Sequence, residues 1–452
     1  VGLDGSEIIG HRADEYYSSF RGKARKKVQE WVEKRADDAL FTILWGVGNH
    51  GGGPSRHDLE DITAYIGECK SHEIVHSTLE DYFAELRAAN VPMKRREKDL
   101  NPWAVGCYTS QIRLKQKHRL LENEIYTVEK MASASAMNGL RSYPKAEIDE
   151  ALEALLLAEF HDILPGSSIE PVETAALRLM DHGLELMARA RARCFFALAA
   201  GQPRGADETN PILVYNPHPF PVRTIIECEH QLADVDWTAD IWHVPVIHQN
   251  GRPLPSQLEK EHCNINWDWR KRSVFLAELA PSQMSRFDCV FDVVEKRPVP
   301  SIEPENGCFD FTSERLHVVI NATTGLMDRY VVDGVDYLKP DAFQPLVLQD
   351  DANAWASMVR EFREVTGAFR LMTPEESAAF AGAEVKTLSP VRVVEDGPVR
   401  RIIEASLVYE GSSLLLTYCL PKEGALVGID VRVQWSAKSA MLKLSIPTVF
   451  PE

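Results

Sequence analysis

The chain has 452 residues, an ordinary apolar fraction of 44% and a formal net charge of −17. That length is typical of about three domains, and the acidic balance argues against nucleic acid or an anionic membrane as a partner, because both bind basic surfaces. No apolar run reaches the roughly 18 residues that a transmembrane helix needs.

Residues 1–99 alternate helical and strand-like patterns. Helices are expected at 22–37, 56–70 and 79–90, and strands at Leu40–Leu44 and Ile74–Thr78. Strand–loop–helix repetition indicates a parallel sheet with crossover helices. With only two strands expected, such a sheet exposes an unpaired strand edge, so we expect some self-association into homo-oligomers.

A glycine-rich stretch follows the first expected strand, reading Trp-Gly-Val-Gly-Asn-His-Gly-Gly-Gly-Pro over 45–54. Glycine accepts positive φ and has no side chain, so backbone there can approach a ligand closely. Asn49 and His50 lie at the mouth of this loop, where α/β enzymes place binding groups after strand ends. The spacing is not that of a phosphate-binding loop, and a plain wide turn is the alternative.

Residues 100–200 carry three helical patterns, at 111–137, 145–160 and 172–200, which predict an antiparallel three-helix bundle. The second helix runs into Phe-His-Asp-Ile-Leu-Pro-Gly-Ser-Ser over 160–168. A break at Pro165–Gly166 holds His161 and Asp162 in a fixed place. Imidazole is a common zinc ligand and a neighbouring carboxylate can bind a hydroxyl group. The alternative is a helix C-terminal cap beside a solvated acid.

The rest of the chain reads as β structure, with a small β-sandwich over 208–300 and further alternating strands over 305–452. Only 373–383 has a helical pattern in this part. The acidic loop Asp350–Trp355 has the composition of a sugar-stacking site, but also that of a common surface loop. Eight scattered cysteines form no C-x-x-C pair, so we expect buried thiols, no disulfide framework and a reducing, cytoplasmic location.

Three stretches in order, 45–54, Gly106–Ser110 and 160–168, resemble the bacterial type of α-mannosidase in glycoside hydrolase family 38. The resemblance implies an exo-acting, retaining enzyme that cleaves terminal α-mannosides of glycans, with two carboxyl groups roughly 5 Å apart. It also implies the fold class, a multidomain chain combining α/β, all-α and all-β parts. These parts are the C-terminal part of a β/α barrel-like catalytic domain (1–99), a three-helix middle domain (100–200), a small β-sandwich (208–300) and the start of a large β-sandwich (305–452).

The resemblance also assigns roles to individual residues. His161 is one ligand of a single zinc ion, which the family holds with two His and two Asp. Asp162, Asn49 and Tyr108 are substrate contacts, and His50 occupies the acid/base position.

The His-x-His-x-Asp and Asp-x-Phe-Gly motifs of the family are not found, so no nucleophile is assigned in this chain. We therefore expect an internal fragment with an incomplete zinc site and no activity of its own. The alternatives are a non-catalytic carbohydrate-binding module and a structural or assembly protein.

Overall fold

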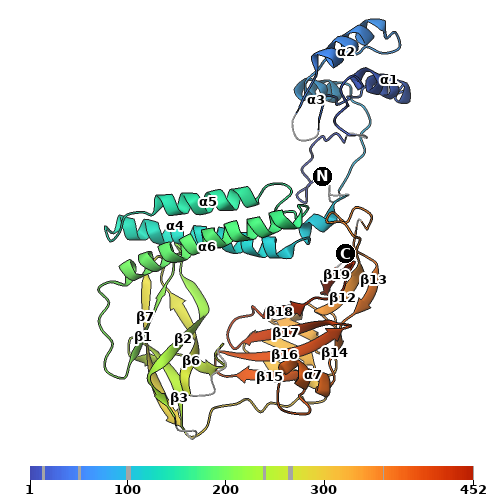
Figure 1. The fold of residues 1–452 in the computed structure, drawn as a ribbon. Helices are drawn as coiled ribbons and strands as arrows, with labels where there is room; N and C mark the ends of the chain where they lie inside the picture. Colours follow the sequence, from blue (N-terminus) through green and yellow to red (C-terminus); the bar gives the residue numbers. More distant parts are fainter. Residues whose placement is uncertain are drawn as a thin grey trace. The chain divides into compact units, whose positions relative to one another are not determined.

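The computed structural model describes residues 1–12, 16–48, 52–97, 103–237, 241–262, 268–359 and 361–450. The chain divides into two compact units, Val1–Leu100 and Asn101–Glu452. The helices are α1 (Ala24–Lys34), α2 (Arg56–Glu68), α3 (Leu79–Ala88), the short 3₁₀ helix η1 (Val105–Tyr108), α4 (Ile112–Met137), α5 (Lys145–Ala158), α6 (Glu170–Ala199) and α7 (Pro374–Ala381) (Figure 1). Within the described ranges, no helix has both the length and the apolar character required to cross a membrane.

The first unit contains the three expected helices but differs from the expected sheet. The predicted strands at 40–44 and 74–78 are wrong, because these residues belong to no strand. Phe41, Ile43 and Ile74 instead pack against the buried core between α1 and α2. An apolar run supplies burial, but a strand also needs a hydrogen-bonding neighbour. The described residues of this unit supply one bridge, between Val47 and Gly53.

The second unit begins with three long helices, α4, α5 and α6, which confirm the helices expected at 111–137, 145–160 and 172–200. Figure 1 shows them side by side, and they share one hydrophobic core. Gly183 of α6 lets the helices approach closely, since a Cβ there would lie 3.0 Å from the Leu121 side chain. The buried core residues are Leu114, Leu121, Ile125, Val128, Ile148, Ala151, Leu155, Ala158, Ala176, Met180, Met187 and Ala190.

Two antiparallel sheets follow the helices and enclose a core of their own. Their orders are β1-β7-β3-β4 and β2-β6-β5. The strands are β1 (Asn210–Tyr215), β2 (Val222–Asp236), β3 (Trp242–Gln249), β4 (Arg252–Pro253), β5 (Ser256–Glu259), β6 (Asp268–Leu279) and β7 (Met284–Val294). Asn250 and Gly251 both have positive φ at the β3–β4 turn, as an Asn-Gly hairpin requires.

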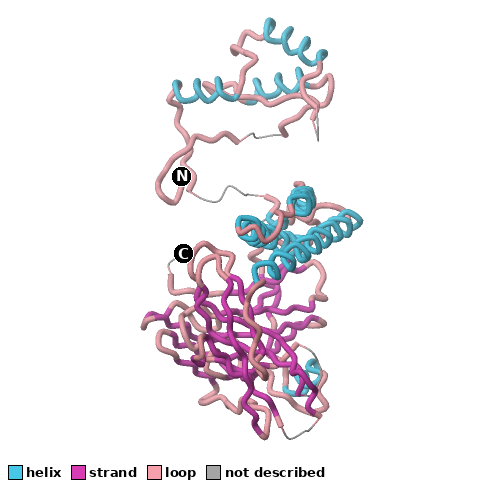
Figure 2. The backbone as a smooth tube through the Cα atoms, turned by 90° about the vertical axis from the view of Figure 1, so that its left-hand side faces the viewer, coloured by secondary structure: helices cyan, strands magenta, loops and turns pink. Residues whose placement is uncertain are grey.

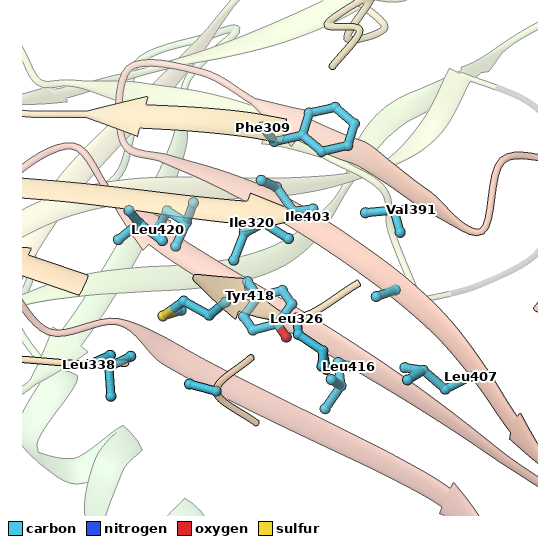
Figure 3. Packing of buried hydrophobic residues seen from close by; sticks show 14 of the residues in the cluster. Phe309, Ile320, Leu326, Leu338, Val391, Ile403, Leu407, Leu416, Tyr418 and Leu420 are labelled. Carbon is cyan, nitrogen blue, oxygen red and sulfur yellow. The ribbon is translucent and has the colours of Figure 1, made fainter. Parts of the chain in front are cut away.

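Three more antiparallel sheets make up the remainder. The strands of all the sheets are magenta in Figure 2. The strands are β8 (Cys308–Thr312), β9 (Leu316–Asn321), β10 (Met327–Val332), β11 (Val335–Asp336), β12 (Gln344–Gln349), β13 (Val365–Ala368), β14 (Arg370–Leu371), β15 (Val391–Asp396), β16 (Arg400–Tyr409), β17 (Ser412–Pro421), β18 (Gly428–Gln434) and β19 (Ala440–Ser445). Their largest core surrounds the buried Tyr418 (Figure 3). The Tyr418 hydroxyl donates to the Gly325 carbonyl at 2.9 Å.

Candidate functional site

The turn after α5 presents a histidine and an aspartate side by side. Nε2 of His161 lies 3.3 Å from Oδ2 of Asp162, and the two side chains are 64% and 36% exposed. The Ser167 hydroxyl donates to Oδ1 of Asp162 at 2.9 Å, which fixes the carboxylate. The Phe160 ring lies 4.2 Å from the His161 ring, centroid to centroid. The arrangement is therefore an exposed, oriented pair of polar groups.

A close approach between this turn and the segment before α4 holds the pair in place. Gly166 has a φ of 79°, and a Cβ there would lie 2.4 Å from the Ser110 carbonyl oxygen. The Lys115 ammonium donates to the carbonyls of Ser110 and Leu164, at 2.5 and 2.8 Å. Gly166 and Lys115 thus join the α5–α6 turn to the lead-in of α4, which we define as residues 103–111.

The lead-in is itself a constrained piece of backbone. Ala104 and Gln111 flank η1 with positive φ values of 62° and 49°, a conformation that costs a non-glycine residue about 1–2 kcal/mol. The Gln111 side-chain amide donates to the Ser168 carbonyl at 3.0 Å. Tyr108, the predicted substrate contact, is 69% exposed on this segment.

The acidic loop noted in the sequence also packs here. The Gly106 amide donates to the Trp355 carbonyl at 3.1 Å, and the Ser110 hydroxyl donates to the Ala354 carbonyl at 2.6 Å. A Cβ on Gly106 would lie 2.7 Å from the Ala354 oxygen, so glycine is required for this contact. The structure therefore joins three segments, 103–111, 160–168 and 350–356, at one corner of the second unit.

A pocket of about 580 Å³ opens at this corner, a size that can hold a small ligand. Burial raises the pKa of the Cys107 thiol and lowers the pKa of the Lys115 ammonium. Nε2 of His118 pairs with the Glu159 carboxylate at 3.0 Å. The pocket is lined by Ala104, Cys107, Tyr108, Lys115, His118, Arg119, Leu164 and Pro165.

The structure brings some of the predicted site residues together and leaves others undescribed. His161 and Asp162 are adjacent, and Tyr108 lies on the segment hydrogen-bonded to their turn. Asn49 and His50 lie outside the described residues. No group of three or more potential metal ligands occurs in the part of the chain that the structure describes. A zinc ion needs three or four protein ligands, so these residues do not fit a complete zinc site.

Sequence reasoning missed Lys115 and His118, which line the pocket. A signal was present, because positions three apart on a helix share a face, and His118 is 8% exposed despite its polarity. What the sequence lacked was any indication that Lys115 would donate to the Leu164 carbonyl, in a turn that is 49 residues further along the chain.

Comparison with known proteins agrees with this architecture. The α-mannosidase middle domain family matches residues 103–198. An α-mannosidase of Saccharomyces cerevisiae is 28% identical over 198 residues, covering 38% of this chain and 17% of the yeast protein. Alpha-mannosidase 2C1 of Homo sapiens is 26% identical over 219 residues, covering 45% of this chain and 20% of the human protein. The matched segments thus span about a fifth of these curated relatives.

Two solved structures share the fold across most of the chain. An α-mannosidase from Enterococcus faecalis V583 superimposes with a TM-score of 0.60 at 13% identity, covering 93% of this chain and 53% of the other. A protein in glycosyl hydrolase family 38 from Enterococcus faecalis gives a TM-score of 0.59, also at 13% identity, with coverages of 94% and 55%.

The chain accordingly combines helices and antiparallel sheets in a fold that it shares with these two structures. More specifically, residues 103–198 match the α-mannosidase middle domain and the curated relatives are α-mannosidases, so the chain is similar to proteins of the α-mannosidase type.

Proposed function

We propose that this chain supplies the middle and β-rich portions of an exo-acting, retaining α-mannosidase, and that its corner of three segments contacts the terminal α-mannoside of a glycan. The observation that carries the proposal is the His161–Asp162 pair, which lies inside the matched middle domain with its carboxylate fixed by Ser167. A fixed, exposed carboxylate is a suitable acceptor for two sugar hydroxyls. Within this proposal Asp162 and Tyr108 contact substrate. The roles expected for Asn49, as a substrate contact, and for His50, at the acid/base position, stay predictions.

The proposal includes a zinc ion, but that ion needs protein ligands in addition to His161. His161 would supply one nitrogen ligand to such an ion. The described residues add no cluster of three ligands. We therefore propose that the 452-residue chain neither binds zinc tightly nor hydrolyses mannosides by itself.

Calorimetric titration of the chain with zinc tests this point, alongside hydrolysis of 4-nitrophenyl α-mannoside with zinc added. We expect no stoichiometric sub-micromolar binding and no turnover above that of His161→Ala. Tight stoichiometric binding together with turnover would mean that all ligands and the nucleophile lie within these residues.

The role of Asp162 is tested by the binding of methyl α-mannoside. Asp162→Asn keeps the shape of the side chain but removes its charge, and a hydrogen bond to a charged group contributes about 1.5–3 kcal/mol. We expect roughly tenfold or greater weakening by calorimetry. Asp149→Asn is the matched control, since Asp149 is an exposed partner of Lys145 on α5. Equal affinity of Asp162→Asn and the control for methyl α-mannoside would contradict the proposal that this corner contacts the sugar.

A non-catalytic carbohydrate-binding module is the second candidate, favoured by the exposed aromatic residues at the corner. A glycan array discriminates, because a module without the mannosidase corner has no reason to require a terminal α-mannoside. A cytoplasmic location remains our proposal, and the seven free cysteines among the described residues are compatible with it. Self-association also stays a prediction.

A further inference from the structure

The pocket at the corner differs in charge from the chain that forms it. Three basic residues, Lys115, His118 and Arg119, line it, and no acidic residue is among the described residues of its wall. The chain as a whole has 67 aspartate and glutamate residues against 50 lysines and arginines. Neither His161 nor Asp162 lines the pocket, so it is distinct from the pair that we propose as a mannose contact.

The cations on the first half of α4 differ in how their charge is balanced. Three of them pair with a carboxylate, but Lys115 donates to two main-chain carbonyls, those of Ser110 and Leu164. No carboxylate in the described part of the chain forms an ion pair with it. The three paired cations and their partners are Arg113 with Glu173, Lys117 with Asp181 and Arg119 with Glu122.

The position of Lys115 makes its unbalanced charge costly. The residue is only partly exposed, and burial lowers the pKa of its ammonium group. A charge that leaves water without an opposite charge nearby is destabilising, and carbonyl dipoles offset only part of that cost. An ammonium group has three donors, two of which serve Ser110 and Leu164. The third remains for a group inside the pocket that Lys115 lines.

The rest of the pocket wall is apolar and fixed in place. Leu164 and Pro165 come from the turn after α5, and Ala104 comes from the lead-in of α4. The close approach of Gly166 to the Ser110 carbonyl holds these two segments together. Sites for small ligands combine apolar walls with a few polar groups, and walls that are ordered beforehand lower the cost of binding.

We infer that this pocket binds a small organic anion, whose carboxylate or phosphate group pairs with Lys115 and whose carbon skeleton packs on Leu164 and Pro165. The anion supplies the opposite charge that the described side chains do not place beside Lys115. A volume of about 580 Å³ accommodates such a molecule. The inference does not require that His161 and Asp162 contact a mannoside, so either can fail without the other.

Alkylation of Cys107 by iodoacetamide tests the inference on the unaltered chain. Cys107 lines the pocket and is partly exposed, so a bound ligand slows its reaction. The probes are benzoate, phenyl phosphate and the uncharged benzamide, which has nearly the shape of benzoate. We expect benzamide to need about tenfold or more of the concentration at which benzoate protects Cys107, because it lacks the charge. Peptide mass spectrometry at constant ionic strength measures the rate, with Cys69 of the first unit as the reference thiol.

Comparing the two anions shows which anionic group the pocket prefers. Protection by phenyl phosphate at lower concentrations than benzoate assigns a phosphate group, and the reverse order assigns a carboxylate. Equal protection by benzamide and by the better anion overturns the inference, as does the absence of protection by both anions.

Three variants then assign the preference to one side chain. Lys115→Gln should abolish the preference for the anions over benzamide, whereas Lys115→Arg should keep part of it. Lys117→Gln is the matched control, since Lys117 lies on the same helix but pairs with Asp181 and does not line the pocket. An unchanged preference in a Lys115→Gln chain that melts like the parent overturns the inference. If that variant unfolds, the comparison of benzoate with benzamide on the parent chain decides.

Discussion

At the scale of single residues, the candidate site depends on small side chains as much as on polar ones. His161 and Asp162 were predictable, because the motif around them is specific and the helix break is visible in the sequence. The contact that orients them was not, since it depends on the absence of a side chain at Gly166 opposite a backbone oxygen far away in the chain. Sequence spacing carries no information about such a contact.

A pair of glycine substitutions isolates that contact. Gly166 and Gly139 have similar positive φ values, 79° and 67°, but a Cβ meets Ser110 at Gly166 and nothing within 4 Å at Gly139. Gly139→Ala should cost about 1 kcal/mol from backbone strain alone. Gly166→Ala should cost about 1–3 kcal/mol more, as overpacking does. Urea unfolding of both variants measures the difference, and equal losses would show that the corner relaxes freely around a methyl group.

At the scale of elements, helices were predicted well and strands unevenly. The helix periods of α4, α5 and α6 are local, and their bounds agree with the structure to within a few residues. The stretch Leu40–Leu44 has the composition of a strand but no partner for its backbone. β6 shows the converse case, because Arg270, Lys271 and Arg272 give it a polar composition although Lys271 is only 1% exposed. Pairing and burial are tertiary properties, which composition does not report.

The N-terminus of α1 gives an element-scale prediction. Asp58 is fully buried, and its Oδ1 accepts from the amides of Gly22 and Ala24 at 2.9 and 3.3 Å. Burial alone would raise its pKa, but hydrogen bonds from Ser55 and these amides outweigh that and lower it. A lowered carboxylate pKa stabilises the fold above the unfolded value of about 3.9, and this contribution is lost as the pH falls through the folded pKa.

We therefore expect Asp58→Asn to reduce the stability of α1 by about 1–3 kcal/mol at neutral pH. Hydrogen exchange of peptides covering α1, compared between the two proteins at matched pH, measures the loss. The difference in α1 stability between the parent chain and Asp58→Asn should narrow as the pH approaches the pKa of Asp58 in the folded chain. Asp61→Asn, at a half-exposed position on the same helix as Asp58, is the control. A stability difference between the parent chain and Asp58→Asn that is the same at all pH values would contradict a role for the charge of the Asp58 carboxylate.

At the scale of the whole second unit, a buried ion network joins the two β regions. Arg400 of β16 donates Nε and Nη2 to the fully buried Glu259 of β5 at 2.7 and 2.6 Å, and Nη1 to Glu227 of β2 at 2.7 Å. Burial would raise the pKa of Glu227, but hydrogen bonds from Arg272 and Arg400 outweigh it and lower the pKa. Oε1 of Gln257 accepts two further hydrogen bonds, from the backbone amides of Val399 and Arg400.

Arg400→Met should destabilise the second unit by about 3–5 kcal/mol, because it leaves the Glu259 charge buried without its main partner. The double variant Arg400→Met with Glu259→Leu should recover much of this loss. Arg315→Ala, which breaks the exposed pair with Asp333, should cost about 0–1 kcal/mol. Thermal unfolding of these three variants, each compared with the parent chain, checks the predicted order of their stability losses. A small loss in Arg400→Met would show that water reaches Glu259.

The central claim is that the corner of the second unit recognises a terminal α-mannoside. The most direct measurement compares the calorimetric affinities of methyl α-mannoside and methyl α-glucoside, which differ only in the configuration of one hydroxyl group. A site built to hydrogen-bond that hydroxyl leaves its polar groups unpaired with the wrong sugar. The account predicts at least tenfold preference for the mannoside. Equal affinities, or a preference for the glucoside, would contradict it.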